Sequence, residues 1–292
     1  MIPAHIIKKI RRIHIKSGRA VNSIMAGQYR SVFRGSGIEF EEVREYSPGD
    51  EVKSIDWKVS ARLGKPFVKL YREERESIVM LLIDMSSSLK FGTFHGPAIE
   101  KAAETASVLA FNAVKNNDKV GVIFFTDRVE KYIPPKKGSS HVWRVIKEIF
   151  TFSPLGRGTN ISGALDFLAK ISKKRSFVFI LSDFLDDGYQ KSLRTVGRRH
   201  EPIGVMIYDK GGFQLPFKGI VTLSDFETSR QITLDGFSKK TKNEFTDARE
   251  AARKKTLDIF SKARSDVIEL ETGALVSDTL QKYFRQRERR NR

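Results

Sequence analysis

Hydrophobic and polar positions follow two different rhythms along this chain. Before residue 78, short runs such as 38–43 and 66–71 alternate apolar and polar residues, which is typical of half-exposed strands. Glycines and the turn sequence Ser47-Pro48-Gly49-Asp50 separate these runs. The pattern predicts a small β-rich subdomain over residues 31–77.

From residue 78 onward, wholly apolar runs alternate with amphipathic stretches at helical spacing. The apolar runs predict strands at 78–84, 119–125, 129–133, 177–182 and 202–208, and the amphipathic stretches predict helices near 98–116, 140–151, 161–172 and 188–199. This alternation predicts an α/β fold, a doubly wound, mostly parallel Rossmann-like sheet with helices on both faces. We assign its core to residues 78–212.

The rhythm breaks over residues 213–264. Two short strand patterns, 220–223 and 230–234, flank a polar turn and predict a hairpin, and a charged helix follows at about 241–263. A strand at 266–270 and a helix at 277–287 then resume the βα pattern. We therefore expect 213–264 to be an insertion and 265–292 to be the last strand and helix of the core, with a basic tail.

The amino-terminal segment 1–30 contains an amphipathic pattern of its own. Isoleucines at helical spacing predict a basic amphipathic helix over residues 4–16. Such a helix could lie on a membrane surface, dock on a partner, or pack on this protein itself.

The charge of the chain is strongly positive. Its 292 residues carry 53 Lys and Arg against 35 Asp and Glu, a net charge of +18, and the two ends supply much of the excess. Basic tails fit an anionic neighbour such as nucleic acid, a membrane surface or an acidic protein, or they serve solubility alone.

Other features of the composition exclude several classes of protein. Cysteine is absent, so there are no disulfides and no thiolate metal site, and the five histidines are scattered. No apolar run approaches the ~20 residues that cross a bilayer. The amino terminus lacks a secretory pattern, and we expect a cytoplasmic protein.

Oxygen-bearing side chains stand where the predicted strands end. Asp84 closes the strand at 78–84, and Ser86 and Ser88 follow it. Thr159 lies in the turn Gly156-Arg157-Gly158-Thr159-Asn160, and Asp183 ends the run at 177–182. Hard oxygen ligands of this kind suit a small divalent cation such as Mg²⁺.

The predicted topology brings these side chains together. In a 3-2-1-4-5 strand order the strands that end at Asp84 and Asp183 are neighbours at the switch point, where α/β sheets bind ligands. Each residue also has a local alternative: Ser86 and Ser88 as turn residues, Thr159 as the N-cap of helix 161–172, and Asp183 as the start of a turn. These alternatives do not explain why all the donors fall at one end of one sheet.

The five residues Asp84, Ser86, Ser88, Thr159 and Asp183 match the metal-ion-dependent adhesion site of the von Willebrand factor A fold. The resemblance covers residues 78–208 and 265–287. It implies a bound Mg²⁺, for which Mn²⁺ or Ca²⁺ can substitute. In such domains the ion commonly bridges to a carboxylate of a partner protein.

The block before residue 78 resembles the bacterial domain of unknown function 58 family. The matching sequences are Gly35-Ser36-Gly37-Ile38-Glu39-Phe40, Arg44-Glu45-Tyr46-Ser47-Pro48-Gly49-Asp50, Ile55-Asp56-Trp57, Ser60-Ala61-Arg62 and Glu73-Glu74-Arg75. Members are typically encoded beside MoxR-type AAA+ ATPases, and a role in chaperoning or assembling other proteins is implied. The family supplies no catalytic residue.

Five residues of this block form a hypothetical surface shared with the ATPase: Arg44, Asp50, Asp56, Trp57 and Arg62. Each also has a structural interpretation. Trp57 would anchor the core of the β subdomain, Asp56 would pair with Arg62, and Asp50 would serve the Pro48-Gly49 turn.

The sequence favours a Mg²⁺-dependent protein-binding module over an enzyme. Asp84-Met85-Ser86 lacks the second aspartate of Asp-x-Asp phosphatases, and the chain has no phosphate-binding Gly-x-x-x-x-Gly-Lys-Ser/Thr loop. A Mg²⁺-dependent hydrolase is the alternative. Nucleic-acid binding, suggested by the charge, lacks a recognised motif.

Overall fold

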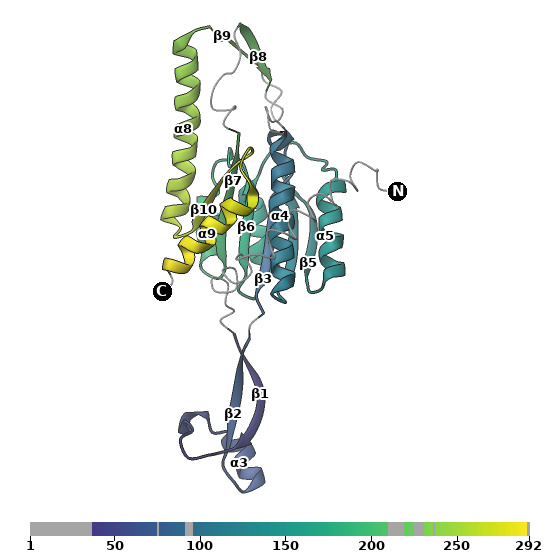
Figure 1. Ribbon diagram of the computed structural model, residues 1–292, viewed down its shortest axis with the longest axis vertical. Helices are drawn as coiled ribbons and strands as arrows, with labels where there is room; N and C mark the ends of the chain where they lie inside the picture. Colours follow the sequence, from purple (N-terminus) through teal and green to yellow (C-terminus); the bar gives the residue numbers. More distant parts are fainter. Residues whose placement is uncertain are drawn as a thin grey trace. The chain divides into compact units, whose positions relative to one another are not determined.

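The computed structural model describes residues 37–74, 76–90, 96–209, 219–224, 231–235 and 237–290 (Figure 1). The amphipathic helix expected at 4–16, like the whole basic segment 1–30, lies outside the described residues. The described residues belong to two compact units, one ending at Ser77 and the other beginning at Ile78.

The smaller unit is built on two antiparallel strands, β1 (Gly37–Glu45) and β2 (Phe67–Glu74). Between them lie a 3-10 turn, Val52–Ser54, and a short helix, α3 (Trp57–Leu63). Gly64 ends α3 in the left-handed conformation, with φ of 71°, which glycine adopts without a steric penalty. The expected β-rich subdomain is confirmed, and α3 is an element that the sequence pattern did not predict.

The larger unit has a six-stranded sheet in the order β10-β7-β6-β3-β4-β5. Its strands are β3 (Ile78–Asp84), β4 (Lys119–Phe125), β5 (Val129–Lys136), β6 (Phe177–Ser182), β7 (Glu201–Tyr208) and β10 (Asp266–Glu271). Neighbouring strands are parallel except β5, which runs antiparallel to β4 at the edge. The predicted order is confirmed, with β3 and β6 side by side at the switch point.

Helices cover both faces of this sheet (Figure 1). They are α4 (Ala98–Lys115), α5 (Ser139–Thr151), α6 (Ile161–Ile171), α7 (Gln190–Gly197), α8 (Lys239–Lys262) and α9 (Val276–Arg290), and a 3-10 turn, Ser88–Lys90, follows β3. Helix α4 contacts α5 and α9, whereas α7 contacts α6 and α8. The fold is thus the doubly wound, mostly parallel α/β sheet that the alternation of elements predicted.

The central strands are apolar throughout because both of their faces are buried. All seven residues of β3 except the first are buried. Met80 and Leu82 join a cluster with residues of α6, α7 and α8, among them Phe260. Burying one such side chain contributes about 1.5–3 kcal/mol, so this layer holds the strand ends firmly in place.

Helix α8 has a partly exposed first part and a carboxyl-terminal part that packs in the core. Ser238 caps its start by accepting a hydrogen bond from the Thr241 amide at 3.2 Å. Its buried residues, Thr256, Ile259 and Phe260, all lie in the last two turns. The strands β8 (Ile220–Ser224) and β9 (Gln231–Asp235) form the predicted hairpin before it. The segment expected to be an insertion therefore also supplies a core-packing helix end between β7 and β10.

Among the described residues, no helix combines the length and the apolar character needed to span a lipid bilayer.

Candidate metal centre

The two predicted carboxylates lie at the ends of neighbouring strands. Asp84 is the last residue of β3, and Asp183 follows the last residue of β6. A hydrogen bond joins the two strand ends, because the Ser182 hydroxyl donates to Asp84 Oδ2 at 2.6 Å. The structure therefore brings together two acids that are far apart in the sequence.

The loop after β3 places both serine hydroxyls beside this edge. The Ser86 amide donates to Asp84 Oδ1 at 2.9 Å, so the carboxylate itself holds the turn. The hydroxyls of Ser86 and Ser88 lie 3.0 Å apart. Asp84 therefore holds the turn, and the two hydroxyls face the carboxylates, with Ser86 hydrogen-bonded to Asp84 and Ser88 to Asp183.

The loop that carries Thr159 is fastened to the same edge at two points. Before Thr159, the Arg157 carbonyl accepts a hydrogen bond from the Ser87 amide at 2.8 Å. After it, the Ile161 amide donates to Asp186 Oδ2 at 2.8 Å. Thr159 thus lies between a contact to the β3 loop and a contact to the β6 loop.

Helix α6 is capped by the residue that follows Thr159. Asn160 Oδ1 accepts a hydrogen bond from the Gly163 amide at 2.7 Å. The interpretation of Thr159 as the N-cap is therefore wrong.

Gly156 allows this loop to pass close to the end of β4. Its amide donates to Glu130 Oε1 at 2.7 Å. A Cβ at position 156 would lie 2.0 Å from Asp127 Oδ1 and 2.2 Å from Thr126 Oγ1, too close for any side chain. Sequence reasoning singled out the glycine turn but missed Glu130 as its anchor, since a lone acid on an edge strand carries no distinguishing signal.

Ser182 is a second residue that sequence reasoning missed. It is fully buried, donates to Asp84, and accepts a hydrogen bond from the Phe184 amide at 3.1 Å. A hydroxyl in an otherwise apolar strand, next to a candidate ligand, was the signal that could have identified it.

Burial disfavours the ionised form of both carboxylates. Burial raises the pKa of Asp84 to about 7, and the nearby charge of Asp183 adds to the increase. Burial also raises the pKa of Asp183, while a hydrogen bond from Ser88 opposes that shift. Two buried acids side by side favour the uptake of positive charge at neutral pH.

The donor set fits a hard divalent cation. It consists of two carboxylates and the hydroxyls of two serines, with Thr159 in the adjoining loop. Within the described ranges, no group of three or more His, Cys, Asp or Glu side chains could hold a metal. A cation here would depend on hydroxyl ligands, and Asp84, Ser86, Ser88, Thr159 and Asp183 are the residues that would hold it. Mg²⁺ accepts such oxygen ligands and usually keeps water in the remaining positions.

In the smaller unit, Arg44 and Asp50 form a bidentate ion pair. Both guanidinium nitrogens lie 2.7 Å from a carboxylate oxygen. Asp50 Oδ2 also accepts a hydrogen bond from the Ser47 amide at 2.9 Å. The expectation that Asp50 serves the Pro48-Gly49 turn is confirmed.

Two other expectations for this unit are wrong. Asp56 caps α3 and forms an ion pair with Lys69 at 3.3 Å, instead of pairing with Arg62. Trp57 is 68% exposed and does not anchor a core. The capping role of Asp56 places residue 57 on the first, outward-facing turn of the helix. Among the residues of this unit whose burial the structure describes, Val68 is the buried apolar one.

Comparison with protein families places the chain. The model of the family described as "Protein of unknown function DUF58" matches residues 42–255, and the chain belongs to this family. Uncharacterized proteins of Mycobacterium bovis and Mycobacterium tuberculosis are 28% identical to it over 231 residues, which cover 77% of this chain and 73% of theirs.

Solved structures with similarity to the chain include an aerotolerance-related membrane protein from Bacteroides fragilis. It is 18% identical, with a TM-score of 0.49, and the match covers 73% of this chain and 99% of that one. Another is proximal thread matrix protein 1 from the mussel byssus, determined with a zinc-occupied MIDAS motif. It is 18% identical with a TM-score of 0.38, and the match covers 45% of this chain and 38% of that one.

Proposed function

We propose that this protein is a divalent-cation-dependent protein-binding module. Mg²⁺ would be held by the five residues of the metal centre, and a carboxylate from a partner protein would complete its coordination. The observation that carries the proposal is the meeting of Asp84 and Asp183 with the paired hydroxyls of Ser86 and Ser88 at one strand edge. The proposal assigns no reaction to the site.

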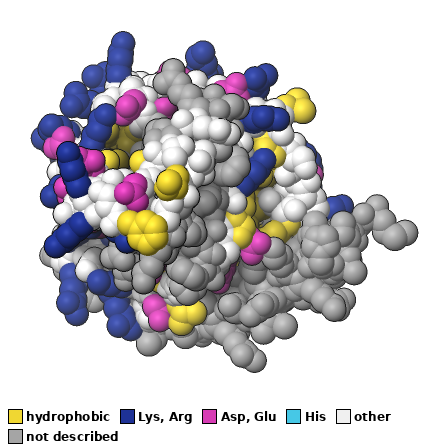
Figure 2. All heavy atoms as spheres, turned by 90° about the horizontal axis from the view of Figure 1, so that it is seen from above, with side chains coloured by type: hydrophobic (Ala, Val, Ile, Leu, Met, Phe, Trp, Pro, Cys, Tyr) yellow, Lys and Arg dark blue, Asp and Glu magenta, His cyan; other side chains and the backbone are white. Residues whose placement is uncertain are grey.

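The surroundings of the site support a protein partner. Leu155, Leu185 and Leu275 lie in loops at the carboxyl ends of the strands and are 88%, 50% and 58% exposed. Figure 2, a view from above, shows exposed hydrophobic side chains among acidic and basic ones. Exposed apolar residues at the same end of the sheet as an ion site provide contact area for a protein that binds there.

We further propose a MoxR-type AAA+ ATPase as the partner, on the basis of the family resemblance. The smaller unit offers a second contact region, because Val52, Trp57 and Leu63 are 62%, 68% and 55% exposed. Exposed tryptophan is a frequent anchor of protein interfaces. Arg44, Asp50, Asp56 and Arg62 would frame this region.

Affinity capture tests the proposal. The wild-type protein is used as bait in native lysate with Mg²⁺ and with EDTA, and Asp84→Asn is used with Mg²⁺, with mass spectrometry as the readout. Among these three samples, we expect an AAA+ ATPase only with the wild-type bait in Mg²⁺. Asp187→Asn, the same chemical change at a side chain 78% exposed in a neighbouring loop, is the matched control and should behave as wild type.

The same partners in all samples would refute metal-bridged recognition. Mg²⁺-dependent turnover of a phosphate ester, abolished by Asp84→Asn, would replace the proposal with the hydrolase alternative.

A further inference from the structure

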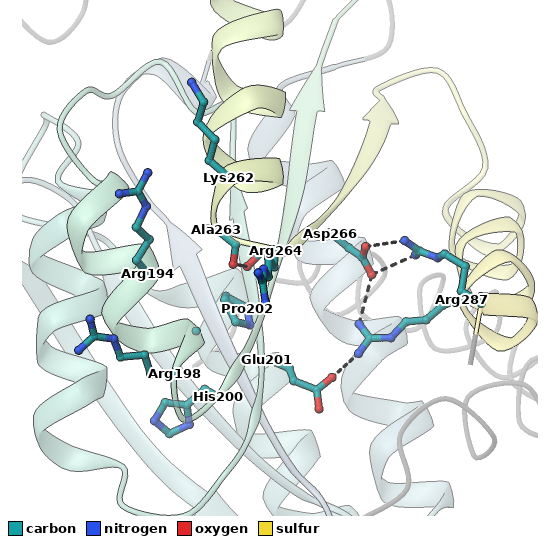
Figure 3. Close-up of a pocket in the computed structure, with 13 residues that line it drawn as sticks. Arg194, Arg198, His200, Glu201, Pro202, Lys262, Ala263, Arg264, Asp266 and Arg287 are labelled. Carbon is teal, nitrogen blue, oxygen red and sulfur yellow. Dashed lines mark hydrogen bonds and ion pairs between the residues drawn. The ribbon is translucent and has the colours of Figure 1, made fainter. Parts of the chain in front are cut away.

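A basic hollow of about 430 Å³ lies at the edge of the sheet opposite the metal centre (Figure 3). Glu201 and Asp266, the first residues of β7 and β10, lie in its wall together with the carboxyl-terminal ends of α7, α8 and α9. Because parallel strands begin here and end at the metal centre, the hollow is a separate feature of the fold.

The lining of the hollow has a large excess of positive charge. Two acids, Glu201 and Asp266, face six cations: Arg194, Arg198, Lys262, Arg264, Arg287 and Arg290. His200 adds no charge at neutral pH, since it is buried with its Nδ1 2.8 Å from the Ser176 hydroxyl, and burial lowers its pKa.

The two acids are already neutralised. Arg287 forms ion pairs with both Glu201 and Asp266 (Figure 3). Arg290 lies 3.0 Å from Asp266. Glu201 also accepts a hydrogen bond from Arg175 at 2.6 Å. These ion pairs occupy both carboxylates of the lining and form one wall of the hollow. The other cations of the lining have no ion pair with either acid.

Three arginines of the lining take no part in these ion pairs. Within the described ranges, Arg194, Arg198 and Arg264 form no hydrogen bond or ion pair through their side chains. Lys262 is paired with Asp258 on the solvent side of α8 at 2.6 Å. Figure 3 shows Arg194 and Arg198 on one side of the hollow and Arg264 between them and the Asp266 wall.

Helix capping does not account for these arginines. Backbone amides already donate to carbonyls in the last turns of α7 and α8: the His200 amide donates to the Val196 carbonyl at 2.8 Å, and the Ser265 amide donates to the Phe260 carbonyl at 2.9 Å. The ends of three helices add a negative potential equivalent to roughly half a charge each, which is less than the three unpaired guanidinium charges.

Arg264 also occupies a backbone position that suits glycine. It follows the end of α8 with φ of 54°, in the left-handed region that an L-residue with a long side chain rarely adopts. Glycine would relieve the strain there, so a large cation at this position adds positive charge to the hollow at a cost to the backbone.

We propose that this hollow binds the phosphate groups of a small oligophosphate-bearing molecule. Guanidinium groups match phosphate oxygens in a planar, two-pronged geometry. A concave site of this size fits a small ligand, whereas nucleic acids and membranes are met by flatter basic surfaces. Arg194, Arg198 and Arg264 would contact the phosphates, and the Arg287 wall would fix the shape of the hollow.

Calorimetric titration of the full chain with inorganic tripolyphosphate tests this proposal in about 150 mM salt, where surface electrostatics are screened. We expect saturable binding at one site, weakened roughly tenfold by Arg198→Gln or by Arg264→Gly, the loss of one charge-assisted contact. Arg264→Gly should keep or raise the thermal midpoint, which separates loss of binding from loss of folding.

Arg144→Gln is the matched control. It removes one exposed positive charge on α5, away from the hollow, and should leave the affinity unchanged. A nucleoside triphosphate that binds more tightly than tripolyphosphate would extend the site to a base or sugar.

Three results would overturn the proposal. They are an absence of saturable binding, an equal loss of affinity in all three variants, and binding of duplex DNA or anionic vesicles, but not tripolyphosphate, that depends on Arg198 and Arg264.

Discussion

Replacing Asp84 with asparagine should stabilise the protein in the absence of metal and abolish its response to Mg²⁺. The carboxylate is completely buried, and its pKa is raised from 3.8 to about 7. A raised pKa means that the folded state prefers the protonated acid. The stabilising contribution is complete below pH 4 and is lost as the pH rises through 7.

The size of the effect follows from that shift. At pH 8 the buried charge destabilises the metal-free protein by about 4 kcal/mol at most, the full width of the shift. Asparagine removes this penalty but disrupts the hydrogen bond from Ser182, at a cost of roughly 1–2 kcal/mol. A net gain of about 2–3 kcal/mol corresponds to roughly 5–10 °C in the midpoint of a unit of this size.

Thermal denaturation at pH 8 is the assay, with EDTA or with Mg²⁺ in excess. In EDTA the midpoint of Asp84→Asn should exceed that of wild type. Mg²⁺ at about 100 times its dissociation constant should raise the unfolding free energy of the wild type by about 2.7 kcal/mol and leave that of the variant unchanged. Wild-type stability in EDTA should also fall between pH 5 and pH 8. A variant that responds to Mg²⁺ as the wild type does, or a wild type that does not respond, would refute the reasoning.

Further substitutions test three separate parts of the structure: the hydroxyl ligands, the cap of α6 and the packing of α8 on the sheet. Ser86→Ala and Ser88→Ala should each weaken the thermal shift caused by Mg²⁺, whereas Ser87→Ala, in the same loop, should not; equal behaviour of all three would exclude hydroxyl ligation. Asn160→Ala removes the cap of α6 and should lower the unfolding free energy by about 1 kcal/mol in denaturant titrations with or without Mg²⁺. Gly204→Ala should cost roughly 1–3 kcal/mol in the same titrations, because a Cβ would lie 2.8 Å from a ring on α8; a neutral result would show that α8 packs less closely on the sheet.

The central sheet could be predicted from the sequence because its strands are buried on both faces. Runs such as β3 and β6 are apolar from end to end, and the intervening helices show a clear period, so type and order followed together. Helix α3 was missed because seven residues are too few to establish a helical period. Its start is marked by the capping carboxylate of Asp56, which local pattern alone did not separate from an ion-pair partner.

The candidate site was predictable in part. Parallel strands end at one edge, so Asp84 and Asp183 could be placed together from topology alone. The contacts that support the site could not be predicted from the sequence. The Ser182 hydroxyl and the Glu130 carboxylate act through tertiary hydrogen bonds that leave no periodic trace in the sequence. The prediction that Trp57 is a core anchor was wrong for a related reason. A large apolar residue is usually buried, but this one starts a helix on an exposed turn.

The most direct test of the central claim is a crystal of the protein soaked in Mn²⁺ and measured at a wavelength where manganese scatters anomalously. We predict one anomalous peak between the Asp84 and Asp183 strand ends, bound to the hydroxyls of Ser86 and Ser88, and no peak there in Asp84→Asn. An empty strand edge in the wild type, or a peak bound elsewhere, would contradict the account.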